Sequence, residues 1–288
     1  MKYKKNYIEM YPVLHCNLKC LNCSMASPYL KPEFESLEQF KKDCDALNKY
    51  YELDIARFTG GECTLHPEIV EFLKYPKEIG LAKMNCIITN GINLLSQPEE
   101  FWKNLDAINL SIYRDTNINY DKIIKKIEGY QKIYPKLQLR ILTDMEVVKT
   151  LVGYQRDIVA KGSEVNIVNG HFKVMHHKDT LNTEEEALDI WKKCWLKDSA
   201  IAIYGGHFYR CPMTYVKAKL YEQSGIESPF DFSKDAIPLH QENTGELIKN
   251  MMESETNIQA CRVCLGFNTG VDVPHRQMRP NEIKIEEI

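Results

Sequence analysis

The sequence predicts an α/β fold built around a parallel sheet. Short runs rich in Ile, Val and Leu alternate with segments whose apolar residues recur at helical spacing. Near-continuous apolar runs are typical of parallel strands, which are buried on both faces. Six such strand–helix units favour right-handed crossovers with the helices on the outside of the sheet. The expected strands span residues 8–14, 53–58, 84–89, 106–112, 137–142 and 163–168.

Three helices can be placed between these strands. Ser36 and Gln39 have the spacing of a capping box, and apolar residues follow at helical spacing up to Tyr51. Residues 67–73 suit a short helix, and residues 120–134 suit a long one.

Composition narrows the class of protein. The chain has 288 residues, 44% of them hydrophobic, which is enough for a full core. A net charge of −3 gives no basic footprint for nucleic acid. No apolar run is long enough to span a membrane, and residues 1–6 are basic without a signal-peptide apolar stretch. We therefore expect a cytoplasmic protein, in which ten cysteines favour metal ligation over disulfides.

Three cysteines follow the first apolar run at close spacing: Cys16, Cys20 and Cys23. Thiols this close cannot pair into good disulfides, but they can hold one corner of an iron–sulfur cube. A cluster built only for electron transfer normally takes four cysteines. Three ligands therefore predict one iron left open for chemistry.

A second motif ends the second apolar run. Gly60 and Gly61 allow close approach of the backbone to a ligand, and Glu62 can accept hydrogen bonds from an ammonium group.

Together these two segments resemble the radical S-adenosylmethionine (SAM) family. The resemblance implies a partial (β/α)6 TIM barrel, open on one side, with the chemistry at the carboxyl ends of its strands. It also implies that SAM chelates the open iron of a [4Fe–4S] cluster and that the Gly-Gly-Glu segment holds the methionine amine. One electron then cleaves SAM to a 5'-deoxyadenosyl radical, which abstracts a hydrogen atom from substrate.

The same resemblance assigns three more SAM contacts at strand ends: Asn90, Ser111 and Arg140. The alternatives are turn chemistry for Asn90 and an ordinary polar strand end for Ser111. Arg140 would pair with the methionine carboxylate, a role suited to a bidentate guanidinium. Asn22 stands where related enzymes carry an aromatic residue beside the adenine, and Met25 or Tyr29 is the expected substitute.

Four further cysteines, Cys194, Cys211, Cys261 and Cys264, come from distant segments of the last third of the chain. Two pairs of this kind can close around tetrahedral zinc or an iron–sulfur cluster. Residues 200–204 and 207–211 predict a β-hairpin around Gly205 and Gly206, which brings Cys194 and Cys211 together before a helix over 213–222.

The Cys-x(9–15)-Gly-x4-Cys spacing that begins at Cys194 resembles the SPASM and twitch subgroups of radical SAM enzymes. With no cysteine after Cys264, the pattern is similar to the shorter twitch type, which implies one auxiliary [4Fe–4S] cluster with no open iron. The predicted domains are a radical SAM barrel (1–175), a twitch domain (176–270) and a tail (271–288). Related enzymes include a cyclitol dehydrogenase and a GTP cyclase; the tail lacks the Gly-Gly ending of the cyclase, so the cyclase is set aside.

The remaining candidates are single residues. Cys44 and Cys86 are expected to pack as hydrophobes. Cys63 directly follows Glu62 and is a candidate catalytic thiol that returns a hydrogen atom to a substrate radical, with packing under the loop as the alternative. A general base for alcohol oxidation could come from His207, Tyr209 or the bridge histidines, which are His171, His176 and His177.

The resulting hypothesis is a radical SAM oxidoreductase. It would abstract a hydrogen atom from a small polar substrate (a sugar, cyclitol or nucleotide-sugar), leading to oxidation or epimerisation, with flavodoxin or ferredoxin as reductant. Radical modification of a ribosomal peptide or protein side chain is the alternative. It is weakened because only 15 residues precede Cys16, too few for a peptide-recognition module. A non-catalytic iron–sulfur or zinc scaffold is the third possibility.

Overall fold

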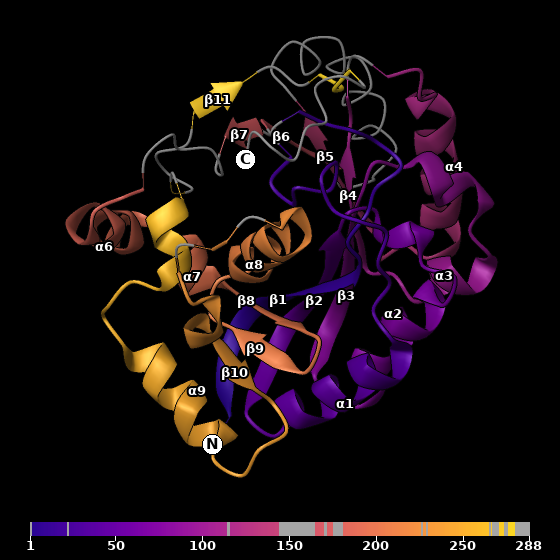
Figure 1. Cartoon of the computed structure of the whole chain (residues 1–288). Coiled ribbons are helices and arrows are strands. Elements are labelled where there is room, and N and C mark those ends of the chain that lie inside the picture. The colour runs from indigo at the N-terminus through magenta and orange to yellow at the C-terminus, as the bar shows by residue number, and fades with distance from the viewer. Residues whose placement is uncertain are drawn as a thin grey trace.

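Six parallel strands lie side by side in chain order and form the larger part of the main sheet (Figure 1). The described sheet has nine strands in the order β10-β9-β8-β1-β2-β3-β4-β5-β6. The first six are β1 (Tyr3–Val13), β2 (Tyr51–Gly60), β3 (Ala82–Thr89), β4 (Ala107–Ser111), β5 (Gln138–Thr143) and β6 (Val165–Asn169). The others are β8 (Ala200–Tyr204), β9 (His207–Tyr209) and β10 (Ala236–Pro238), while β7 (Phe172–Val174) pairs separately with β11 (Val271–Val273).

The computed structural model describes residues 2–21, 23–113, 116–143, 165–169, 172–174, 181–225, 227–228, 230–264, 266, 271–273 and 276–279. Asn22 and the bridge histidines lie outside these residues. Each of the six predicted strands overlaps one of β1 to β6, so the prediction of a parallel α/β sheet is confirmed. β1 begins five residues earlier than expected, because the charged residues after Tyr3 still pair in register with β2.

The helices lie between and after the strands. They are α1 (Leu37–Asn48), α2 (Ile69–Glu78), α3 (Glu99–Lys103), α4 (Tyr120–Ile133), α6 (Glu184–Lys193), α7 (Leu196–Ser199), α8 (Met213–Ser224) and α9 (Thr244–Glu253). Short 3-10 helices are η1 (Cys63–Leu65), η2 (Ile92–Ser96), η3 (Phe232–Asp235) and η4 (Gln259–Val263). Among the described helices, none is long and apolar enough to cross a lipid bilayer.

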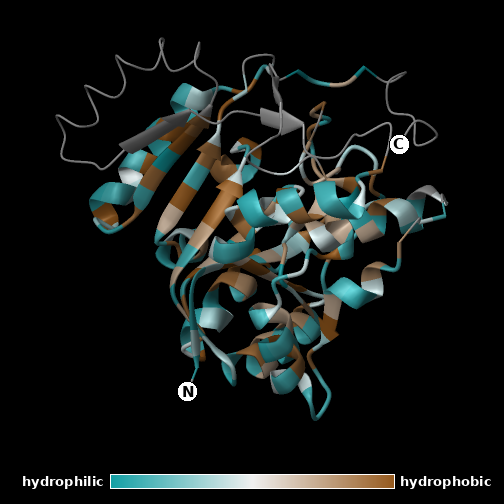
Figure 2. Cartoon of the chain, turned by 90° about the vertical axis from the view of Figure 1, so that its left-hand side faces the viewer, coloured by the Kyte–Doolittle hydropathy of each residue, from teal (hydrophilic) through white to brown (hydrophobic). Residues whose placement is uncertain are grey.

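One face of the sheet is packed against α1 to α4, which lie along one side of the molecule in Figure 1. Ile8, Phe58 and Ile108 from the strands meet Phe72 of α2 and Ile127 of α4 in one apolar core. Burying a side chain of this size contributes about 1.5–3 kcal/mol. Figure 2 shows the hydrophobic stretches of the strands beside helices that alternate hydrophobic and hydrophilic residues, as amphipathic helices do.

The cap of α1 forms only in part as expected. Ser36 accepts the Gln39 backbone N–H at 3.4 Å, which is one half of a capping box. The Gln39 side chain instead donates to Asp43 Oδ1 at 2.7 Å, because that buried carboxylate lies one turn further along α1.

The predicted hairpin is present as β8 and β9, and it extends the same sheet. β8 runs parallel to β1, with Tyr7 opposite Ala200 and Met10 opposite Ile203. A second apolar cluster covers this part of the sheet, where Met213 and Val216 of α8 meet Met25 and Leu30 from the segment after Cys23. One sheet therefore contains strands from both sides of residue 175, where the boundary between the two domains was predicted.

A buried carboxylate joins α1 to the hairpin turn. Glu35 is 8% exposed, and its Oε2 accepts the Gly205 N–H at 3.1 Å. Burial, together with the neighbouring Asp43 carboxylate, raises the pKa of Glu35 to about 7.

This pKa predicts a loss of stability with rising pH. Between about pH 4.5 and pH 7 the unfolded chain releases the Glu35 proton while the folded chain keeps it, so the free energy of unfolding falls by about 3 kcal/mol across that window. Glu35→Gln should remove this dependence and be more stable than the wild type at pH 8. Urea unfolding at pH 5 and pH 8 measures the effect.

Glu38→Gln serves as the control, because Glu38 lies three residues further along the chain and its side chain is exposed in the first turn of α1. Equal changes with pH in the wild type and in Glu35→Gln would contradict the assignment.

Candidate active site

The three-cysteine loop is held at the carboxyl end of β1 by the end of β2. Gly61 N donates to Val13 O at 2.8 Å, and Glu62 N donates to His15 O at 3.0 Å. The entry to the loop is also fixed by the Leu14 N–H, which donates to Glu33 O at 3.1 Å. The predicted position of the motif, at the carboxyl edge of a parallel sheet, is therefore observed.

The thiols of Cys16, Cys20 and Cys23 are all partly buried in this loop. Burial raises the pKa of Cys16 to about 12, and the nearby Glu62 and Cys23 add to the effect. Two carboxamides donate toward the sulfurs: Asn90 Nδ2 lies 3.6 Å from Cys16 Sγ, and Gln277 Nε2 lies 3.4 Å from Cys20 Sγ. Three thiols with amide donors around them fit the ligand set of an iron–sulfur cluster, whose sulfurs commonly accept such hydrogen bonds.

The two glycines are required by contact within the chain itself. A Cβ on Gly61 would lie 1.9 Å from His15 O, and a Cβ on Gly60 would lie 2.2 Å from Val13 O. Gly60 also has φ of +115°, a conformation that side chains disfavour. The close approach expected of these glycines is thus first an approach of β2 to the cysteine loop.

The Glu62 carboxylate is 1% exposed and is occupied by donors of the chain. Its Oε1 accepts from Thr64 N, Thr64 Oγ1 and Thr89 Oγ1, and its Oε2 accepts from Asn90 N at 2.8 Å. Each carboxylate oxygen offers about two acceptor positions, so these bonds occupy Oε1 fully and leave one position on Oε2. Burial raises the pKa of Glu62, while the hydrogen bonds oppose that rise. The carboxylate ties β2 to the end of β3, and its predicted contact with the methionine amine stays a prediction.

Asn90 reaches the cysteine loop from the end of β3. Its Nδ2 donates to Asn17 Oδ1 at 2.7 Å, and its Oδ1 accepts from Ile92 N at 3.0 Å. The second bond is the turn chemistry that the sequence also allowed, and the contact of Asn90 with SAM stays a prediction.

Ser111 lies buried at the end of β4, beside a tyrosine that the sequence analysis missed. The Tyr113 side chain hydrogen-bonds to that of Ser111, and its pKa is raised by burial and by the neighbouring thiols of Cys20, Cys23 and Cys16. The signal available in the sequence was its position two residues after a polar strand end. The structure therefore brings a phenol to the same edge as all three thiols.

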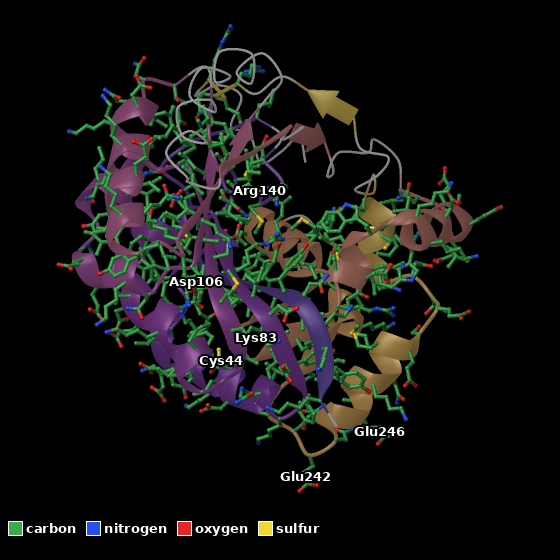
Figure 3. The ribbon with its side chains drawn as sticks, turned by 180° about the vertical axis from the view of Figure 1, so that it is seen from behind. Cys44, Lys83, Asp106, Arg140, Glu242 and Glu246 are labelled. Carbon is green, nitrogen blue, oxygen red and sulfur yellow. The ribbon has the colours of Figure 1, made fainter. Side chains whose placement is uncertain are left out.

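Arg140 lies on β5 opposite Asn109 of β4, on the face of the sheet turned away from α1 to α4. In Figure 3 it lies farther along the sheet than Lys83 and Asp106, which mark the starting ends of β3 and β4. Its charge and that of Arg57 both lower the pKa of Cys86, while burial raises that pKa to about 11. This face, which we call the inner face of the sheet, thus carries the cations Arg57 and Arg140 around Cys86.

Arg57 belongs to a buried polar group on the inner face. It forms an ion pair with Glu9 on β1, and its guanidinium lies 3.7 Å from the centre of the Tyr7 ring. Tyr11 Oη donates to Glu9 Oε2 at 2.9 Å and so completes the group. Sequence patterns do not mark this pair, because β1 and β2 carry other charged residues as well, such as Lys4 and Asp54.

Cys63, the candidate catalytic thiol, is fully buried in the apolar core that also contains Phe72. Its Sγ donates to Ile88 O at 3.6 Å, and burial raises its pKa well above the ordinary value. This position favours packing over hydrogen-atom donation. Cys44 lies in the same core, as expected.

His207 and Tyr209, the two candidate bases among the described residues, each contact other groups of the protein. His207 Nδ1 lies 2.9 Å from Gly205 O within the hairpin turn, and Tyr209 is buried against Tyr215. Burial raises the pKa of Tyr209.

The second set of cysteines converges on one cavity. Trp191, Met213 and Lys217 line this cavity together with the four thiols. The four are Cys194 at the end of α6, Cys211 before α8, and Cys261 and Cys264 in and after η4. Within the described ranges, no three His, Cys, Asp or Glu side chains are grouped closely enough for a single metal ion.

Two residues that the sequence analysis did not single out hold this cavity in shape. The buried Asn182 side chain donates to Cys261 O at 2.8 Å and to Cys264 O at 2.7 Å. Lys217 is 3% exposed and donates to Val263 O at 2.9 Å. A buried ammonium beside four thiols would offset the negative charge of thiolates, so the donor set fits an anionic metal centre.

The contact between β2 and the cysteine loop gives a test. Gly61→Ala should force the two segments apart, lower the stability and reduce the iron retained after anaerobic reconstitution, because its Cβ overlaps a backbone oxygen. Iron analysis and thermal unfolding measure both effects.

Gly129→Ala is the matched control, since a Cβ there meets nothing within 4 Å in α4. It should keep the wild-type iron content and be more stable by about 0.5–1 kcal/mol. Wild-type iron content and stability in Gly61→Ala would refute the proposed need for close approach.

This chain is similar in sequence to several known proteins. Residues 10–149 match the family model of the Radical SAM superfamily. The GTP 3',8-cyclase of Clostridium botulinum (strain Okra / Type B1) is 23% identical over 280 residues, covering 92% of this chain and 77% of the cyclase. The antilisterial bacteriocin subtilosin biosynthesis protein AlbA of Bacillus subtilis (strain 168) is 25% identical over 203 residues, covering 62% of this chain and 45% of AlbA.

Among solved structures, Streptococcus suis SuiB bound to S-adenosylmethionine is similar, with a TM-score of 0.42 and 15% identity. The similarity covers 80% of this chain and 64% of the SuiB chain, so this chain spans less than two thirds of SuiB. This chain is therefore similar to the radical SAM superfamily over residues 10–149, and its similarity to the cyclase extends over 92% of the chain.

Proposed function

We propose that this protein is a radical SAM oxidoreductase that abstracts a hydrogen atom from a small polar substrate. The observation that carries the proposal is the junction of Cys16, Gly61, Glu62 and Asn90 at one edge of the sheet. These residues come from three different strand ends, and their hydrogen bonds connect them into one unit.

The fold and domain assignments form part of the proposal. The sequential strands β1 to β6, with helices on one face, support a partial (β/α)6 barrel over residues 1–175. The hairpin, α8 and the four-cysteine cavity support a twitch domain over 176–270. The tail, 271–288, would be a third segment.

Cys16, Cys20 and Cys23 would hold the [4Fe–4S] cluster implied by the family, which supplies the electron that cleaves SAM to the 5'-deoxyadenosyl radical. The segment Gly60-Gly61-Glu62 would hold the methionine amine. The hydrogen bonds from Thr89 and Asn90 to the Glu62 carboxylate would position this segment against the end of β3.

Arg140 and Ser111 would bind the carboxylate end of SAM. Arg140 is exposed and carries a guanidinium that can form a bidentate pair. Ser111 already hydrogen-bonds to Tyr113, so that phenol would orient its hydroxyl. The adenine would pack near Met25 or Tyr29, in the segment that follows Cys23.

The cavity of Cys194, Cys211, Cys261 and Cys264 would hold the auxiliary [4Fe–4S] cluster. Four protein ligands leave no iron for substrate, so this site would serve in electron transfer or structural support. A flavodoxin or ferredoxin would supply reducing electrons.

Oxidation and epimerisation both follow from abstraction of a hydrogen atom. Because Cys63 lies in the apolar core, it offers little support for returning a hydrogen atom, so oxidation is the outcome we propose. The curated relative named for GTP acts on a small polar molecule, which supports this substrate class.

Radical modification of a peptide or protein side chain is the second candidate. The observation that favours it is the similarity to AlbA, whose name places it in bacteriocin biosynthesis.

Loss of the first three cysteines should abolish SAM cleavage. In the Cys16→Ala, Cys20→Ala, Cys23→Ala triple variant no 5'-deoxyadenosine should form under anaerobic reducing conditions, because no ligand set remains for the cluster. Chromatography of the reaction mixture measures this product.

Cys44→Ala is the control, since it removes a buried thiol from the apolar core on the other face of the sheet. It should still form 5'-deoxyadenosine. Product formation by the triple variant would refute the assignment.

The auxiliary site predicts a metal count. Anaerobically reconstituted wild type should contain about eight iron and eight sulfide per chain, as two [4Fe–4S] clusters require. Cys261→Ala, Cys264→Ala should contain about four of each. A wild type with about four iron and one zinc would show that the second site is a zinc site.

A further inference from the structure

The segment 276–279, near the end of the chain, pairs with the first cysteine loop. Met278 N donates to Lys19 O at 2.7 Å, and Leu21 N donates to Arg276 O at 2.9 Å. These bonds form an antiparallel bridge between Cys20 and Gln277. About 250 residues of chain separate the two partners, so the contact is a tertiary one and not a local turn.

The Gln277 side chain adds two contacts to this bridge. Its Oε1 accepts the Lys19 N–H at 2.7 Å, while its Nε2 donates to Cys20 Sγ at 3.4 Å. One carboxamide therefore fixes the backbone before Cys20 and places an N–H against its sulfur. Cys20 is also half-buried, which strengthens an electrostatic contact to its sulfur.

A hydrogen bond to a cluster thiolate shifts the reduction potential. Reduction adds negative charge, so an N–H directed at the sulfur stabilises the reduced state more than the oxidised state. The donor therefore raises the potential. A carboxylate in the same place would lower it.

We propose that Gln277 is a positioning residue of the SAM-binding cluster, which fixes the Cys20 loop and raises the reduction potential of the cluster through its N–H to Cys20. The proposal rests on Cys20 being a cluster ligand, as proposed above. It gives the segment 276–279 a role at the active site.

Two substitutions separate the two contacts. Gln277→Glu keeps an oxygen to accept the Lys19 N–H but places negative charge against the Cys20 sulfur. Gln277→Leu removes both contacts while keeping a similar size. Gln223→Leu is the matched control, because Gln223 also accepts a backbone N–H, from Lys31 at 2.6 Å, on α8.

The experiment is a redox titration of the holoenzyme in which electron paramagnetic resonance measures the reduced cluster. The signal that changes when SAM is added identifies the cluster at Cys16, Cys20 and Cys23. The proposal predicts a lower potential in both Gln277 variants, by about a tenfold change in the reduction equilibrium, or about 59 mV for one electron. The wild type and Gln223→Leu should agree.

A wild-type potential in either Gln277 variant would overturn the proposal. If a variant retains no cluster, hydrogen exchange of the full chain replaces the titration. Faster exchange at the Lys19 and Leu21 amides than in wild-type protein treated in the same way supports the proposed fixing of the Cys20 loop by Gln277. Equal exchange refutes it. If wild-type protein instead forms no cluster that responds to SAM, the proposed function fails, and this outcome is distinct from an unchanged potential.

Discussion

The close contact between the ends of β1 and β2 is the constraint on which the candidate active site depends. Gly60 and Gly61 lie so near Val13 and His15 that a side chain at either position would overlap a backbone oxygen. The Glu62 carboxylate then extends the same contact to β3, through Thr89 and Asn90. Three strand ends are thus fixed relative to the cysteine loop before any cofactor binds. This lowers the loss of conformational entropy when a cofactor binds.

A second consequence concerns the relation between the two cysteine sites. Cys23 and Cys211 pack against the same apolar cluster, in which Met25 and Leu30 meet Met213 and Val216. This cluster also covers β8, which pairs directly with β1. The last third of the chain is therefore attached to the parallel strands of the main sheet by both hydrogen bonds and apolar packing. Displacement of one cysteine site would disturb the packing around the other.

Much of this architecture is encoded locally and could be predicted. Apolar runs mark β1 to β6, and the cysteine spacing with Gly60 and Gly61 marks the strand ends that meet. Residues that act through tertiary contacts gave no such signal. Gln277 contacts Cys20, which lies at the other end of the chain. Asn182 donates to the carbonyl of Cys261, and the Glu62 carboxylate accepts from Thr89 of β3. Cys63 stood next to the motif in sequence, yet its side chain turns into the core.

We expect the loop of Cys16, Cys20 and Cys23 to leave one iron open for SAM. Electron paramagnetic resonance of the reduced, anaerobically reconstituted protein tests it most directly, because coordination of SAM alters the electronic environment of that iron. Addition of SAM should change the signal in the wild type. A signal that is identical with and without SAM would contradict it.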